Sequence, residues 1–159
     1  MTNELLTGGT VAAAVGCALV AGLLFAFSTS VMPALRQRPA AEGIAVMQAI
    51  NSTILNPLFG IMFGGTTVLC LVLAATAPFT TDTSHATLRG IGGALYVVGV
   101  FVETMVVNVP MNNALDAVDP AADEGASYWR SYLRRWTAWN HVRALLGSAA
   151  SVTLAVSLL

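Results

Sequence analysis

Residues 108–115, Asn-Val-Pro-Met-Asn-Asn-Ala-Leu (NVPMNNAL), end one of the most apolar runs in the chain. This stretch places three asparagines and a proline where a lipid-facing helix should finish. An amide near hydrocarbon is costly unless it finds a hydrogen-bond partner. Asn108 and Asn112 are four residues apart and share one helical face. We therefore expect that face to meet other helices, for packing or for chemistry.

The composition indicates a membrane protein with a single domain, residues 1–159. The chain is 56% hydrophobic and only 9% charged, whereas a soluble domain carries about 25% charged residues. All seven basic residues are arginine and the net charge is −1, so nothing suggests a nucleic-acid surface. Cys17 and Cys70 lie inside apolar runs and are expected to pack as small hydrophobic side chains.

Four apolar runs are long enough to cross a bilayer core, which needs roughly 20 helical residues. They cover about 9–32, 55–77, 88–111 and 137–159. Short connections make consecutive helices antiparallel neighbours. The sequence therefore predicts an all-α, integral membrane, up-down four-helix bundle. Between the first two spans, residues 40–50 show the apolar spacing of a short amphipathic helix, which we expect at the membrane interface.

The arginines predict the orientation of the chain in the membrane. Five of them fall in the first and third connections: Arg36, Arg38, Arg130, Arg134 and Arg135. By the positive-inside rule these connections face the cytoplasm and both termini face out. No basic segment precedes the first apolar run, so we interpret it as a retained helix and not as a cleaved signal peptide. Small residues at four-residue spacing permit close approach of helices. This pattern is compatible with a homo-oligomer.

Depth along the helices predicts a buried ion pair. Helices rise about 1.5 Å per residue, so Glu103 and Arg143 lie at matching levels, roughly 12–14 Å from the cytoplasmic ends of their spans. Asn108 and Asn140 lie at about 6–7 Å by the same count. An isolated charge at this depth costs at least about 2.5–3.5 kcal/mol, and a partner reduces that cost. We predict a Glu103–Arg143 pair with both asparagines hydrogen-bonded nearby.

Other polar residues are expected at the same end of the bundle. Trp136 lies on the inward face of the fourth span, Ser28 lies near the end of the first, and Asn51 and Asn56 flank the start of the second. The cytoplasmic half of the bundle is therefore predicted to be polar inside, and the outer half dry. A purely structural role, in which these groups only fix helix register, explains the same pattern.

The two histidines give little support for a metal centre. His141 is an interfacial residue, a proton carrier or a metal ligand. His85 belongs to the opposite, outer connection, so a haem or copper site held by two histidines is disfavoured and no metal ligand is assigned. Other haem or metal sites stay open. The sequence contains no CxxC, no glycine-rich phosphate loop and no nucleophile elbow.

Four segments, spread over essentially the whole chain, resemble the anthrone-oxygenase-like family of bacterial membrane proteins. They are FSTSVMPAL (27–35), INSTILNPLF (50–59), NVPMNNAL (108–115) and WTAWNHVRALL (136–146). The resemblance implies a four-helix protein of the bacterial inner membrane. For the characterised members it also implies oxidation of the central methylene of a tricyclic phenolic anthrone by dioxygen, without a recognised metal or flavin.

The resemblance leads to a hypothesis of a monooxygenase without a cofactor, acting on a lipophilic phenolic, aromatic or quinone-like substrate with dioxygen as co-substrate. The catalytic candidates are His141, Arg143, Glu103 and Asn140, and the substrate-binding candidates are Asn108, Asn112, Trp136, Asn56, Asn51 and Ser28. His141 is preferred to Glu103 as the base, because Arg143 favours the ionised carboxylate. Arg143 and the asparagines would stabilise an enolate or peroxide oxygen, and Trp136 would stack on the substrate.

Two other kinds of function fit the same residues. The protein could bind or transport a lipophilic metabolite or a proton, or serve as a structural membrane subunit without catalysis. The expected partners are the lipid bilayer and a small lipophilic aromatic molecule. Whether the cavity opens to lipid or to the cytoplasm is left open by the sequence.

Overall fold

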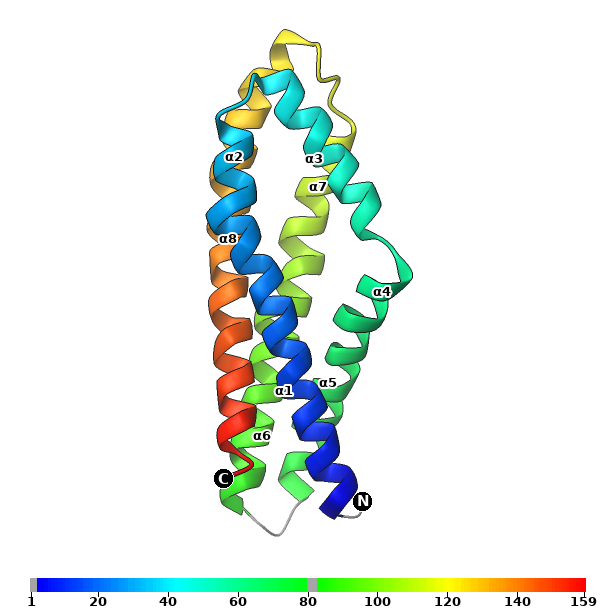
Figure 1. Ribbon diagram of the computed structural model, residues 1–159, viewed down its shortest axis with the longest axis vertical. Coiled ribbons are helices and arrows are strands. Elements are labelled where there is room, and N and C mark those ends of the chain that lie inside the picture. Colours follow the sequence, from blue (N-terminus) through cyan, green and yellow to red (C-terminus); the bar gives the residue numbers. More distant parts are fainter. Residues whose placement is uncertain (1–2, 80–82) are drawn as a thin grey trace.

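The computed structural model describes residues 3–79 and 83–159, nearly all of them helical and none in a strand (Figure 1). This confirms the predicted all-α class. The predicted connection between the second and third spans includes residues 80–82, which lie outside the described residues.

The helices form long rods with short π-helical turns inside them. The first rod joins α1 (Asn3–Ala26), η1 (Phe27–Val31) and α2 (Met32–Arg36). After the separate helix α3 (Ala40–Ile54), the second rod joins α4 (Pro57–Gly60), η2 (Ile61–Gly65), α5 (Thr66–Thr76) and the 3₁₀ turn η3 (Ala77–Phe79). The third joins α6 (Thr83–Tyr96), η4 (Val97–Val102), η5 (Thr104–Asn108) and α7 (Val109–Asp116), and the last is α8 (Asp123–Val156).

Within the described residues, three helices are long and apolar enough to cross a membrane: Glu4–Arg36, Pro57–Phe79 and His85–Asp116. They contain the first and third predicted spans and residues 57–77 of the second, whose predicted start is at about residue 55. The fourth predicted span, about 137–159, lies mostly in α8, which is not among these three helices. Its average hydropathy is lowered by exposed arginines in its first half and by buried polar residues such as Asn140 and Arg143.

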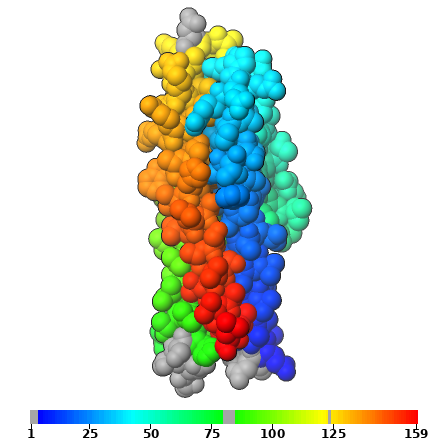
Figure 2. Space-filling view, turned by 60° about the vertical axis from the view of Figure 1, so that its left-hand side comes forward, coloured from blue at the N-terminus to red at the C-terminus, as the bar shows by residue number. Residues whose placement is uncertain are grey.

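The rods pack side by side along the length of the molecule. α1 contacts α5 and α8, while α6 contacts the same two helices from the other side. α8 lies along α1, as Figure 2 shows, and α8 ends at the end of the molecule where α1 begins (Figure 1). Apolar residues fill the half nearest these ends, where Cys17 of α1 and Cys70 of α5 are buried with their Sγ atoms 3.6 Å apart.

The amphipathic helix predicted at residues 40–50 is present as α3 and extends to Ile54. Its buried face presents Ile44 and Met47 to a second apolar cluster, which includes Trp129, Tyr132 and Trp136 of α8. Gly43 allows close contact at this interface: a Cβ added there would lie 2.8–2.9 Å from ring atoms of Trp129. α3 therefore packs tightly on the start of α8.

Replacing Gly43 with alanine tests this contact. Overpacking costs roughly 1–3 kcal/mol, so G43A should lower the midpoint of thermal unfolding in detergent, followed by circular dichroism. G22A is the matched control, because nothing lies within 4 Å of a Cβ at Gly22; alanine in a helix interior should leave that variant equal to wild type or slightly more stable. Equal midpoints for both variants would contradict the packing.

Candidate functional site

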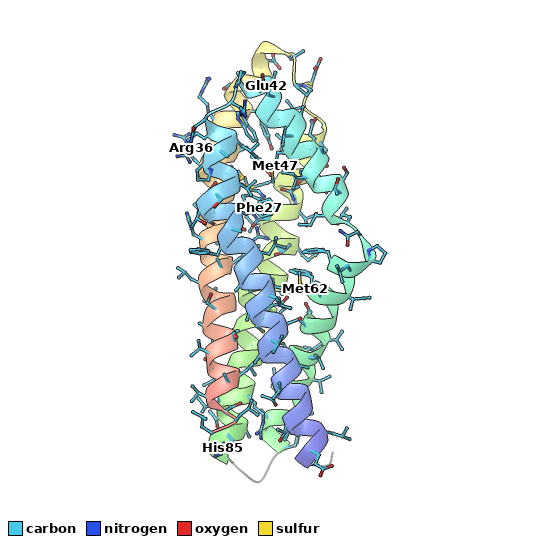
Figure 3. All side chains as sticks on the ribbon, in the orientation of Figure 1. Phe27, Arg36, Glu42, Met47, Met62 and His85 are labelled. Atoms are coloured by element: carbon cyan, nitrogen blue, oxygen red, sulfur yellow. The ribbon has the colours of Figure 1, made fainter. Side chains whose placement is uncertain are left out.

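A cavity of about 620 Å³ lies in the half of the molecule away from the start of α1 and the end of α8. It is bounded by α1, α3 and α4 on one side and by η5, α7 and α8 on the other. Phe27 and Met47, labelled in Figure 3, are among its lining residues. The wall from α1, α3, α4 and η2 is mostly apolar and includes Val20, Leu23, Leu24, Ile50, Ile54, Phe59 and Phe63. The opposite wall is polar and includes Thr104, Asn108, Asn112, Asn113, Asp116 and Arg143. The volume falls within the range of small-molecule sites.

A break between α3 and α4 shapes the cavity. Leu55 and Asn56 leave the helical conformation, and the chain restarts as a helix at Pro57. Asn56 Oδ1 accepts a hydrogen bond from the Phe59 amide at 3.0 Å, while Pro57 occupies the first turn, where no donor is required. The restarted helix bulges away from α1 and α7 (Figure 1), and residues of both sides line the space between them.

The predicted ion pair between Glu103 and Arg143 is present and buried. Arg143 Nε lies 3.2 Å from Glu103 Oε2, with side chains 6% and 9% exposed, respectively. The Nε–H makes no directed hydrogen bond, so this contact is one of charge. The two terminal nitrogens donate instead to Thr104 Oγ1 at 2.9 Å and to Asn140 Oδ1 at 2.7 Å. The guanidinium is thus held from both the third and the fourth rods.

Asn108 bridges the two charges. In the amide orientation that gives both of its polar atoms a partner, Nδ2 lies 2.8 and 3.1 Å from the two oxygens of Glu103. Oδ1 then accepts from Arg143 Nη2 at 3.0 Å and from Trp136 Nε1 at 3.2 Å. The cost of burying this asparagine is offset by four polar contacts, and the residue also lines the cavity wall.

Asn140 ties the same group to the first rod. It is fully buried, and its Nδ2 donates to the Leu24 carbonyl at 2.6 Å and to Ser28 Oγ at 2.7 Å. The π-helical turns η1, η4 and η5 lie beside this network, and such turns are frequent at functional sites. Asn140 and Ser28 therefore stand behind the cavity wall and hold Arg143 in place.

A second layer of polar contacts lies toward α3. Asn112 Oδ1 accepts from Tyr132 Oη and Trp136 Nε1, each at 2.8 Å. Burial raises the pKa of Tyr132, so its phenol keeps the proton that it donates. Asn51 Nδ2 donates to Asp116 Oδ1 at 3.3 Å. These contacts place a neutral phenol, Tyr132, and a carboxylate, Asp116, on the α3 side of the ion pair.

The sequence-predicted residues divide into three groups. Asn51, Asn56, Asn108, Asn112, Trp136 and Arg143 line the cavity. Glu103, Asn140 and Ser28 lie behind its wall in the hydrogen-bond network. His141 is exposed on the outer surface of α8 and takes no part in this group.

Thr104, Asn113 and Asp116 also line the cavity, although they are not among the residues predicted from the sequence. The signal for Asp116 was available, because it follows Asn108 and Asn112 at four-residue spacing. Within residues 3–79 and 83–159, no three His, Cys, Asp or Glu side chains gather as a metal site would require.

The fold and the cavity define a helical protein with apolar spans and a buried polar wall. Residues 56–153 match the family model described as anthrone oxygenase, and the chain belongs to this family. The matched region runs from the break before α4 into α8 and so includes Glu103, Asn108 and Arg143. No curated protein and no solved structure matches the chain.

Removing one partner of the ion pair should be strongly destabilising, because it leaves an uncompensated buried charge. E103A should lose about 3–5 kcal/mol of unfolding free energy, measured by denaturant titration in detergent micelles. The control is E42A, at an exposed carboxylate of α3, which should behave as wild type. Since E103Q/R143Q removes both charges, it should be more stable than E103A; a double variant that is no better would argue against a charge-based contact.

Proposed function

We propose that this protein is a membrane-embedded oxygenase that oxidises a lipophilic phenolic aromatic molecule of the anthrone type with dioxygen. The observation that carries this proposal is the placement of a buried cation and amide, Arg143 and Asn108, on the polar wall of a cavity whose opposite wall is mostly apolar. Membership of the anthrone oxygenase family supports the reaction class. The apolar spans support a location in the bacterial inner membrane.

The proposal includes four membrane spans in an up-down bundle, with α8 as the fourth. Apart from His141, the exposed large side chains in the second half of α8 are apolar, among them Val142, Leu145 and Val152, whereas Asn140 and Arg143 are buried. Such a helix can face lipid although its average hydropathy is modest. The common end of α1 and α8 supports an even number of crossings (Figure 1), and the arginine distribution favours both termini outside.

Proton abstraction from the substrate is the first proposed step. The reacting methylene loses a proton to a base, which leaves an enolate whose oxygen faces Arg143 and Asn108. Asp116 is better placed for this role than the sequence candidates, because its carboxylate lines the cavity. Glu103 is occupied by Asn108 and Arg143, and His141 is exposed elsewhere.

Dioxygen then acts as the oxidant. The electron-rich carbanion reduces dioxygen and forms a carbon–oxygen bond, which gives a hydroperoxide at the former methylene after protonation. Loss of the second methylene proton with cleavage of the oxygen–oxygen bond gives a carbonyl and one molecule of water. The apolar wall keeps water from the anion, while the positive charge of Arg143 on the polar wall stabilises it.

Oxygen uptake tests the oxidation. Purified protein in detergent should consume one dioxygen per quinone formed from a hydroxylated anthrone, faster than the spontaneous reaction. R143Q should lose about 10²–10³ in kcat, the usual effect of deleting a charge-stabilising donor. R134Q, at an exposed arginine of the same helix, should keep full activity. Saturable binding without any oxygen uptake would instead favour a carrier.

Replacing the proposed base gives a separate test. D116N preserves the shape of the side chain but cannot accept the proton, so kcat should fall by roughly 10²–10⁴, while binding of the quinone product is retained. D119N is the control, because Asp119 lies outside this cavity and its Oδ1 accepts from the Ala121 amide. Unchanged turnover in D116N would remove Asp116 from the reaction.

A further inference from the structure

The cavity opens on one side of the molecule, between α4 and the η5–α7 segment. The lining residues that are also exposed lie on these two segments and at the break before α4: Leu55, Asn56, Pro57 and Gly60 on one edge, and Met105, Asn113 and Asp116 on the other. On either side of the opening the rods are in contact, α3 with α7 and α5 with α6. The opening is therefore a gap between two spans.

The surface around this gap is suited to lipid. Leu58 and Ile61, next to the α4 edge, are 77% and 73% exposed, and Val106, beside the opposite edge, is 64% exposed. Large apolar side chains clustered in this way mark a contact surface for lipid or another apolar partner. Within the apolar span His85–Asp116, Met105 and Val106 lie about three helical turns from the last residue. The gap thus lies where hydrocarbon gives way to headgroups.

The cavity lining changes from apolar to charged along the edge formed by η5 and α7. Met105, Asn108, Asn112 and Asp116 follow one another within η5 and α7. A flat phenolic molecule that enters from lipid at the level of Met105 therefore meets the amide groups of Asn108 and Asn112 before it reaches Asp116.

We infer that the cavity is loaded from the bilayer, through the gap between α4 and η5–α7, by a flat lipophilic molecule with one oxygen-bearing edge. The class of ligand rests on the proposed function, whereas the route rests on the gap and on its apolar surroundings. The break at Asn56 and Pro57 is what turns α4 outward, so the same residues that cap this helix also form one edge of the entrance.

Gly60 and Gly64 offer a matched pair of positions for blocking the gap. A Cβ at either glycine would meet nothing within 4 Å, so both tolerate a side chain. Gly60 lines the cavity at its entrance, whereas Gly64, one turn further along the same rod, does not. Cys17 and Cys70 are fully buried, so a thiol reagent should react at an introduced cysteine before it reaches them.

The experiment measures entry of a probe and does not require turnover. G60C and G64C are reconstituted in phosphatidylcholine vesicles and treated with benzyl methanethiosulfonate. The association rate of 1,8-dihydroxyanthraquinone is then followed by quenching of tryptophan fluorescence, since Trp136 lines the cavity. Labelled G60C should associate at least about tenfold more slowly, and a reductant should restore the rate, because a blocked route slows entry without changing the site itself. Labelled G64C and treated wild type should keep the original rate.

The outcomes separate the route from the function. An unchanged rate in labelled G60C, or an equal loss in labelled G64C, would overturn the entrance while leaving oxygen uptake as support for the oxygenase. Absence of probe binding in wild type would overturn both. A wild-type rate of probe entry in labelled G60C would contradict this route even if the label abolished oxygen uptake.

Discussion

The contact on which the rest of the structure depends is the buried meeting of Glu103 and Arg143. Neither charge is tolerable alone inside an apolar bundle, so their pairing fixes the level at which the third rod faces α8. Asn108, Thr104 and Asn140 complete the coordination of both groups. Asn140 then extends the network to Ser28 and the Leu24 carbonyl on the first rod. One polar layer thus sets the register of three rods.

The same layer forms the wall of the cavity, which makes stability and chemistry hard to separate at these residues. Arg143 and Asn108 contact Glu103 on one side and the cavity on the other. Because Glu103 balances Arg143, the ion pair adds no net charge to the wall, and the remaining carboxylate there is Asp116. A neutral phenolic ligand can therefore bind beside the ion pair without meeting a net charge, and Arg143 matters most once negative charge develops.

Much of the fold and part of the site could be predicted from the sequence for a simple reason. Polar residues in apolar helices must find partners, and counting helical rise places Glu103 opposite Arg143 without knowledge of the fold. Helical rise alone does not give the direction in which a side chain points in the folded protein. His141 is adjacent to Asn140 in sequence but points outward, and Asp116, beyond the predicted span, reaches the cavity only because α7 continues into it. The outward turn of α4 likewise depends on how the chain resumes after Leu55, which periodicity does not reveal.

The dipeptide Asn56-Pro57 has a consequence for insertion into the membrane. An interruption in a helix normally leaves amide hydrogens without acceptors, a serious penalty in hydrocarbon. Here proline supplies no hydrogen at the restart, and the asparagine side chain accepts the one from Phe59. The discontinuity thus satisfies part of its own backbone hydrogen bonding without help from a neighbouring helix. The second rod can therefore lie apart from its neighbours near the middle of the molecule. This leaves space for a ligand without requiring a mobile segment.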